Sequence, residues 1–222
     1  MDGDLRLRDG GEGQQGVTNA VIFDLFETLV DYDEEKSRAF SAAAADLLGR
    51  EPAAFHALWR EGRRARDTGP MLPYFESIGI TGGDAERLLA LRRANSAELL
   101  REPRPGVVEM LGELGRRGIR RGLITVCSED VVDIWPETLF AGLFDAEVFS
   151  CQCRLHKPDP RIYELALRLL EVDAADALYV GDGTNDELAG AERAGMRAVQ
   201  LGDRDGWAGP RIRTPPDVLE LV

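Results

Sequence analysis

Ala20-Val21-Ile22-Phe23-Asp24, which begins the part of the chain expected to be ordered, is a short apolar run that ends at an aspartate. An apolar run of this length, bounded by polar residues, is typical of a strand that is buried on both faces in a parallel sheet. Open parallel sheets bind their ligands beyond the carboxyl ends of the strands. We therefore predict that Asp24 leaves the first strand at the edge of the sheet where a functional site forms.

Beyond residue 102 the sequence alternates between short apolar runs and amphipathic segments. The predicted strands lie at 119–125, 146–150, 178–180 and 198–201, and the predicted helices at 107–117, 160–170 and 187–194, with a short helix from Glu129. Strands that alternate with helices of about ten residues indicate βαβ units. The predicted fold class is therefore α/β, with a Rossmann-like parallel sheet.

Residues 33–102 interrupt this alternation and contain no convincing strand. Alanine and leucine recur there at helical spacing, between breakers at Gly49, Pro52, Gly69-Pro70 and Gly82-Gly83. The helices predicted in this region lie at 38–48, 53–66 and 85–100. We interpret the chain as a disordered tail over residues 1–19, a Rossmann-like core formed by 20–32 and 103–222, and an all-helical domain of residues 33–102 inserted into that core.

The composition narrows the class of partner. The 222 residues include 40 acidic and 27 basic side chains, which gives a formal net charge of −13. Such a field repels phosphate backbones and anionic membrane surfaces, so we expect neither a nucleic acid nor a membrane as partner. No apolar stretch reaches the length of a membrane span, no secretory signal is recognisable, and three cysteines are too few for a disulfide scaffold. We predict a cytoplasmic protein with a small-molecule substrate, and the oligomeric state stays open.

Four chemically compatible groups follow the predicted strands. Asp24 and Asp182 each leave the end of a strand, Thr125 ends another, and Lys157 lies in the loop after the strand at 146–150. Two carboxylates from separate strands can hold a divalent cation through oxygen ligands, and a lysine offers a point charge to an anionic group. These residue types predict a metal-assisted site for an anionic substrate.

The same groups belong to four motifs that occur in a fixed order. Together the motifs resemble those of the haloacid dehalogenase superfamily of hydrolases. They are Asp24-Leu25-Phe26-Glu27-Thr28-Leu29, Leu123-Ile124-Thr125, Lys157-Pro158-Asp159-Pro160 and Gly181-Asp182-Gly183-Thr184-Asn185-Asp186. The resemblance extends from residue 21 to about residue 201, and the inserted helical domain lies where that family places its helical cap.

The resemblance implies a catalytic role for several residues. Asp24 would be the nucleophile and would form a covalent aspartyl intermediate that water then hydrolyses. Thr125 would hydrogen-bond the transferring group, and Lys157 would balance the charge on nucleophile and substrate. Arg63 of the cap would join Thr125 and Lys157 in binding the substrate.

The resemblance also implies a metal site. Mg²⁺ would be held by the carboxylates of Asp24 and Asp182 and by the backbone carbonyl of Phe26. Asp186 would lie next to this metal or would orient Lys157. The implied cofactor is therefore Mg²⁺.

One position departs from the family pattern. Phosphatases of this superfamily usually have a second aspartate two residues after the nucleophile, which protonates the leaving alcohol and later activates water; this chain has Phe26 there. General acid–base assistance is typically worth about 10²–10⁴ in rate. We therefore expect a leaving group that needs little protonation, unless another residue supplies the proton. The polar cap residues most able to reach the site are Arg60, Arg63, Arg66 and Asp67.

Three functions are compatible with these observations. A Mg²⁺-dependent phosphohydrolase acting on a small phosphorylated metabolite explains the acidic residues and Lys157. A metal-independent 2-haloacid dehalogenase explains Phe26, because halide leaves without a proton, but it needs no acidic metal pair, and the polar residue common after the Thr/Ser is here Val126. The third is a catalytically weak binding or regulatory protein, since a protein can keep its fold after it has lost its catalytic activity. We favour the phosphohydrolase.

Overall fold

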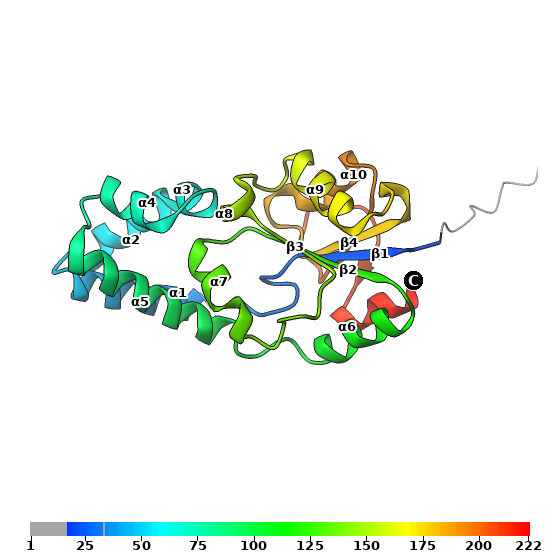
Figure 1. Cartoon of the computed structure of the whole chain (residues 1–222), viewed down its shortest axis with the longest axis horizontal. Helices are drawn as coiled ribbons and strands as arrows, with labels where there is room; N and C mark the ends of the chain where they lie inside the picture. Colours follow the sequence, from blue (N-terminus) through cyan, green and yellow to red (C-terminus); the bar gives the residue numbers. More distant parts are fainter. Residues whose placement is uncertain (1–16, 33) are drawn as a thin grey trace, which may run out of the picture.

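The computed structural model describes residues 17–32 and 34–222 (Figure 1). Within them, six parallel strands form one sheet in the order β3-β2-β1-β4-β5-β6. The strands are β1 (Ala20–Phe23), β2 (Arg120–Thr125), β3 (Ala146–Phe149), β4 (Ala177–Gly181), β5 (Arg197–Leu201) and β6 (Arg211–Ile212). The predicted α/β, Rossmann-like fold is confirmed, and the short strand β6 adds to it.

The first strand, β1, lies between β2 and β4, and all four of its residues are fully buried. Its alternate residues contribute to two separate hydrophobic cores. The helix α6 (Val107–Arg116) covers one of these cores, and α9 (Pro160–Leu170) and α10 (Glu187–Arg193) cover the other, on the opposite face of the sheet (Figure 1). Burial on both faces explains why this strand is an uninterrupted apolar run in the sequence.

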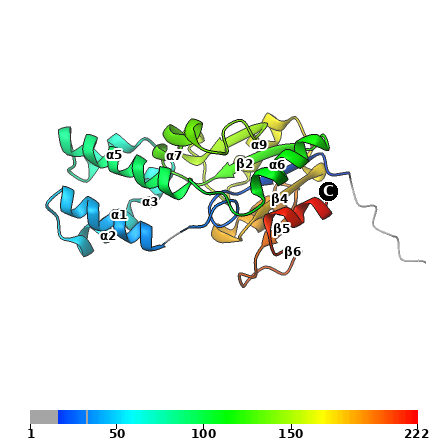
Figure 2. The same ribbon diagram turned by 90° about the horizontal axis from the view of Figure 1, so that it is seen from below.

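Five helices form a second group of elements beyond the carboxyl edge of the sheet (Figures 1 and 2). They are α1 (Glu34–Leu47), α2 (Pro52–Glu61), α3 (Arg63–Asp67), α4 (Met71–Ser77) and α5 (Gly82–Leu99), and we call them the cap. The apolar faces of α1, α2, α4 and α5 enclose a hydrophobic core of their own, which includes Trp59, Phe75 and Leu88. The cap therefore has its own packing and can present a wall to the edge of the sheet.

The cap helices differ in detail from the prediction. The single helix predicted at 53–66 is divided at Gly62 into α2 and α3. A Cβ atom at Gly62 would lie 2.0 Å from the hydroxyl oxygen of Tyr74, so this glycine admits the close approach of α4, a helix that the sequence did not predict. Gly82 and Gly83 are predicted to separate helices, but they form the first turn of α5. The N–H groups of a first turn have no acceptor within the helix, so glycine is tolerated there.

The remaining helical segments connect the strands, except the last of them, which follows β6. They are α7 (Glu129–Ile134), α8 (Ser150–Cys153), η1 (Trp135–Glu137), η2 (Ala174–Asp176), η3 (Thr184–Asp186) and η4 (Pro215–Glu220). Two of them contact the cap: Arg93 of α5 donates to Asp133 of α7 at 2.8 Å, and Ser150 of α8 donates to the carbonyl of Asp67 at 2.6 Å. None of the described helices is both long and apolar enough to cross a membrane.

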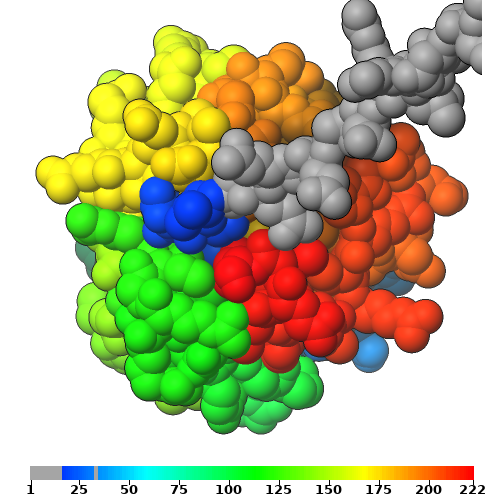
Figure 3. All heavy atoms as spheres, turned by 90° about the vertical axis from the view of Figure 1, so that its right-hand side faces the viewer, coloured from blue at the N-terminus to red at the C-terminus, as the bar shows by residue number. Residues whose placement is uncertain are grey.

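The described chain begins at the edge of the sheet opposite the cap. Figure 3, viewed from that end, shows the first described residues (blue) between the yellow and green segments. The N–H of Asn19 donates to the carbonyl of Asp176 at 2.8 Å, and the N–H of Arg120 donates to the carbonyl of Asn19 at 2.9 Å. Of the tail predicted for residues 1–19, residues 1–16 lie outside the described residues.

Candidate active site

A cavity of about 570 Å³ separates the cap from the carboxyl edge of the sheet. This volume lies in the range of small-molecule sites. From the core it is lined by groups that include Asp24, Phe26, Lys157, Asp182 and Glu187, and from the cap by Arg60, Arg63, Arg66 and Asp67. The chain thus gathers most of the residues singled out from the sequence around one cavity.

Asp24 and Lys157 are in direct contact at the base of this cavity. Lys157 Nζ donates to Asp24 Oδ1, to Glu187 Oε2 at 2.5 Å and to the hydroxyl of Tyr179 at 3.1 Å. Burial disfavours the lysine's charge, but the two carboxylates outweigh it and raise the pKa of Lys157 above its usual range. Burial also raises the pKa of Asp24, against the opposing effect of Lys157. The lysine stays charged and holds the aspartate in place.

Asp182 is fixed by the turn that follows β4. The N–H of Thr184 donates to Asp182 Oδ1 at 3.0 Å, its hydroxyl donates to Oδ2, and Arg204 donates to Oδ2 at 2.8 Å. Burial raises the pKa of Asp182, but these contacts outweigh it and the pKa is lowered overall. Gly183 has φ +92°, and a Cβ there would lie 2.9 Å from the side chain of Gln200, so the turn needs glycine.

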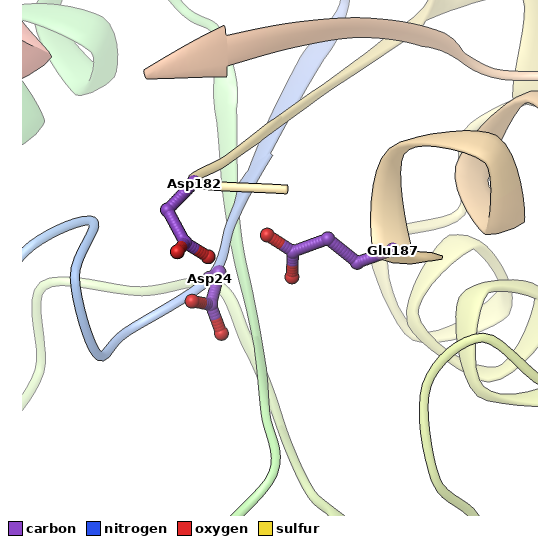
Figure 4. A group of neighbouring side chains, drawn as sticks. All are labelled: Asp24, Asp182 and Glu187. Carbon is purple, nitrogen blue, oxygen red and sulfur yellow. The ribbon is translucent and has the colours of Figure 1, made fainter. Parts of the chain in front are cut away.

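The donor set at the base of the cavity fits Mg²⁺. One carboxylate oxygen from each of Asp24, Asp182 and Glu187 lies within 4.8 Å of the others (Figure 4). Both oxygens of Glu187 are already engaged, one by Lys157 and the other by the N–H of Gly183 at 3.0 Å. Asp24 Oδ2, in contrast, accepts a long bond of 3.3 Å from the hydroxyl of Thr28. Both oxygens of Asp182 are engaged as well, but by Thr184 and by Arg204, whose side chain is 53% exposed, and not by the buried Lys157. Hard oxygen donors of this kind are the ligands that Mg²⁺ prefers, and Asp24 and Asp182 stay the predicted pair.

Of the two roles predicted for Asp186, a contact with Lys157 is not among the described interactions, and a place beside the metal stays a prediction. The side chain of Asp186 is 64% exposed and pairs with Arg193 at 3.2 Å, while Glu187, 1% exposed, holds Lys157. Asn185 and Asp186 both have positive φ values, 58° and 56°, and this turn places Glu187 rather than Asp186 against the lysine. The sequence contains two adjacent acids, Asp186 and Glu187, and the backbone conformation determines which of them contacts Lys157.

Thr125 ends β2 and is fully buried. Its hydroxyl has no hydrogen-bond partner within the described part of the chain, and the next three residues line the cavity. An unpartnered buried hydroxyl costs about 1–3 kcal/mol. Thr125 itself is not among the described residues that line the cavity, so the hydrogen bond predicted from it to the transferring group remains a prediction.

All four cap residues named from the sequence reach the cavity wall. Arg66 is 5% exposed, stacks 3.8 Å above the ring of Trp59 and donates to the Trp59 carbonyl at 2.6 Å. Arg63, whose side chain is 66% exposed, pairs with the buried Asp67 at 3.3 Å. The cap therefore contributes both cations and one buried carboxylate to the site.

Phe26 makes the position two residues after Asp24 apolar. Its ring lines the cavity and meets Tyr32 edge-on, with 6.2 Å between ring centroids. The adjacent Glu27 has φ +62°, and its carboxylate accepts the N–H of Tyr32 at 2.7 Å and lies 3.5 Å from Arg104. The carboxylate of Glu27 is thus held by Tyr32 and Arg104 and does not replace an acid at position 26.

Comparison with known proteins identifies the family. The sequence profile of haloacid dehalogenase-like hydrolases matches residues 18–195, and the chain belongs to that family. Among curated relatives, phosphoglycolate phosphatase 1 of Pseudomonas aeruginosa is 32% identical over 187 residues, which cover 82% of this chain and 68% of the relative.

Solved structures of two activities share the fold. A 2-haloacid dehalogenase from Pseudomonas syringae pv. Tomato DC3000 matches with a TM-score of 0.69 and 25% identity, covering 92% of this chain and 98% of that one. A HAD phosphatase from Thermococcus onnurineus matches with a TM-score of 0.71 and 21% identity, covering 92% of this chain and 97% of that one. At these identities the likeness describes architecture, and the chemistry must be argued from the site.

Proposed function

We propose that this protein is a Mg²⁺-dependent phosphohydrolase that acts on a small, anionic phosphorylated metabolite. The observation that carries the proposal is the pair of buried carboxylates, Asp24 and Asp182, which have oxygens within 4.8 Å of each other at the base of the cavity. Two like charges at this separation disfavour each other's ionisation, and a divalent cation relieves that repulsion. Hydrolysis of a phosphate ester is the chemistry that needs such a cation. The relationship to a curated phosphatase supports the same choice.

The residues of the chain have separate tasks in this proposal. Asp24 attacks phosphorus and displaces the alcohol, and water then hydrolyses the aspartyl phosphate. Lys157 holds Asp24 in place and keeps a positive charge beside the transferring group, while the unpartnered hydroxyl of Thr125 would donate to a phosphoryl oxygen. Asp182, Asp24 and the carbonyl of Phe26 would hold the metal. When bound, Mg²⁺ supplies positive charge that offsets the charge of the phosphoryl group.

The charge of the cap wall supports a small anion as substrate. Among the described residues that line the cavity, the cap contributes Asp67 as its single carboxylate, against the arginines Arg38, Arg60, Arg63, Arg66 and Arg92. This local excess of cations occurs in a chain whose net charge is −13. The same net charge argues against nucleic acid or an anionic membrane as partner, and the free thiols of the described cysteines support a cytoplasmic location.

The alternative is a 2-haloacid dehalogenase, and one observation favours it. Phe26 gives the site an apolar wall where phosphatases of the superfamily usually have an acid, and halide needs no proton to leave. The alternative gives no reason for two adjacent carboxylates, because displacement of halide by Asp24 requires no cation. We therefore rank it second.

A turnover screen tests the proposal. Phosphate esters and 2-haloacids are assayed with Mg²⁺ and with a chelator, in the wild type and in Asp24→Asn. We expect release of inorganic phosphate that requires Mg²⁺ and is lost in the variant, because an amide is a poor nucleophile. Release of halide that is indifferent to the chelator would replace the proposal with the dehalogenase. Metal binding without turnover of any compound would favour a binding protein instead.

A further inference from the structure

Asp67 is the cap carboxylate that faces the cavity. It is the last residue of α3, it is 6% exposed, and it lines the same cavity as Asp24 and Phe26. The other carboxylates of the described cavity wall, including Asp24 and Asp182, come from the core segments that follow β1 and β4. The cap thus contributes a carboxylate to the cavity that also holds the proposed nucleophile.

The position of Asp67 is fixed by the end of the sheet. Its carbonyl accepts the hydroxyl of Ser150 at 2.6 Å, and the same hydroxyl accepts the N–H of Cys127 at 3.0 Å. Cys127 lies two residues after Thr125, at the carboxyl end of β2. The cap residue is therefore anchored to the segment that forms the floor of the site and does not depend on a long flexible side chain for its placement.

The surroundings of Asp67 suit a group that gives and takes a proton. Burial raises the pKa of its carboxyl, against the opposing effects of Arg63 and Arg66 on its own helix and of His156, whose Nε2 lies 4.0 Å away. Cys127 faces it from the core. Asp24 and Glu187 are less suited, since Lys157 holds both of them in charged contacts.

We propose that Asp67 supplies, from the cap, the proton that the aspartate absent at position 26 would otherwise supply. This inference rests on the proposed function. In the first step Asp24 Oδ forms a bond to phosphorus, the phosphorus–ester oxygen bond breaks, and the ester oxygen takes the proton of the Asp67 carboxyl and leaves as an alcohol. In the second step water attacks the phosphorus of the aspartyl phosphate, its proton passes to the Asp67 carboxylate, and Asp24 is released with inorganic phosphate.

The substrate class follows from this assignment. In an in-line displacement the leaving oxygen lies opposite the nucleophile, which is the side that the cap covers. An acid on that side would allow the enzyme to hydrolyse alkyl phosphates, because their alkoxide leaving groups need a proton. A site without an acid would be confined to acyl and aryl phosphates, which expel more stable anions.

The test compares two leaving groups in the full-length protein with Mg²⁺. In Asp67→Asn we expect kcat/KM for an alkyl phosphate to fall about 10²-fold or more, and kcat/KM for an aryl phosphate to fall less than about tenfold. For the alkyl ester, the loss of activity at high pH that reports the protonated donor should disappear in the variant. Asp67→Glu keeps an acid and should retain most of the alkyl activity.

The control is Asp46→Asn, which changes an exposed cap aspartate outside the cavity and should leave both activities unchanged. Circular dichroism and titration with Mg²⁺ verify that each variant is folded and binds metal. Equal losses on the two esters would make Asp67 merely structural, and unchanged values would place the donor elsewhere; either result overturns the inference and leaves the phosphohydrolase standing. If the wild type hydrolyses no phosphate ester, both proposals fail.

Discussion

Glu187 Oε2 lies 2.5 Å from Lys157 Nζ, and the same nitrogen donates to Asp24 Oδ1. The residue proposed as nucleophile is therefore held by a lysine that a second buried carboxylate shares. Burial raises the pKa of Glu187 to about 7, with Lys157 opposing the shift. Three buried ionisable groups thus depend on one another, and removing any one of them shifts the pKa of the other two.

Glu187→Gln should weaken catalysis without removing a group that touches the substrate. The amide keeps the shape of the side chain but removes one of the two carboxylates that hold the lysine, so Lys157 turns toward Asp24 alone. We expect kcat/KM to fall about 10–100-fold, the usual effect of removing a partner that orients a site residue. Steady-state kinetics on a single phosphate ester measures it.

Asp186→Asn is the matched control for this prediction, since it changes the neighbouring acid, which is exposed and contacts Arg193. It should leave kcat/KM within about twofold, as surface substitutions away from special features usually do. A large loss in Asp186→Asn with little loss in Glu187→Gln would return the role to the residue named from the sequence and contradict the geometry.

Asp182→Asn should weaken the binding of Mg²⁺, measured by calorimetric titration with the metal alone. The substitution removes one of the two carboxylates proposed as ligands, and we expect affinity to fall at least about tenfold. Asp205→Asn, which changes an exposed acid of the nearby loop, is the control and should bind as the wild type does. Equal affinity in Asp182→Asn and the wild type would move the metal site elsewhere.

Arg204→Gln should act on the same titration in the opposite direction. Arg204 donates to Asp182 Oδ2 at 2.8 Å through a side chain that is 53% exposed, so a guanidinium competes with the metal for this oxygen. An exposed ion pair is worth about 0–1 kcal/mol, and we therefore expect Mg²⁺ to bind up to about fivefold more tightly in the variant. Weaker binding would mean that Arg204 organises Asp182 for the metal instead.

Asp159→Ala should lower the free energy of unfolding by about 1 kcal/mol at pH 7, because Asp159 caps the N-terminus of α9. Its hydrogen bonds with Arg161 lower the pKa of Asp159 to about 2. A carboxyl with a depressed pKa stabilises the fold above its unfolded pKa of about 3.9, and the contribution is lost as the pH falls through the folded value.

Urea denaturation of the wild type and Asp159→Ala at pH 7 and near pH 2 should therefore give a difference that shrinks on acidification. Asp173→Ala is the control, since Asp173 precedes η2 without a side-chain capping bond, and its effect should stay within about 0.5 kcal/mol. A difference independent of pH would assign the stabilisation to packing and not to the carboxylate.

Much of the core was predictable because its signals are local. Burial of β1 on both faces imposes an apolar run, and Asp24 marks its end. The helices of the cap were less predictable, since the break at Gly62 depends on the distant ring of Tyr74. Likewise, two successive positive φ values place Glu187 in the site. Contacts between segments far apart in the sequence leave no periodicity to detect.

Phe26→Asp distinguishes a site without an acid from one whose acid lies in the cap. Phe26 lines the cavity two residues after Asp24, so an aspartate there would face the same leaving oxygen as Asp67. If Asp67 already donates, the substitution should change the ratio of kcat/KM for aryl to alkyl phosphates by less than about threefold in the wild-type background. In the Asp67→Asn background it should lower that ratio by at least about tenfold, because one acid replaces the other.

The substitution Phe26→Asp can itself weaken the fold or the binding of Mg²⁺, so both must be measured beside the kinetics. An aspartate at position 26 adds a carboxylate next to Asp24 and Asp182, and like charges in a buried site raise one another's pKa. Thermal unfolding and Mg²⁺ titration show whether Phe26→Asp keeps its fold and metal. If it does, and the ratio falls equally in both backgrounds, the wild type lacks a proton donor, and Phe26 marks an enzyme restricted to leaving groups that need none.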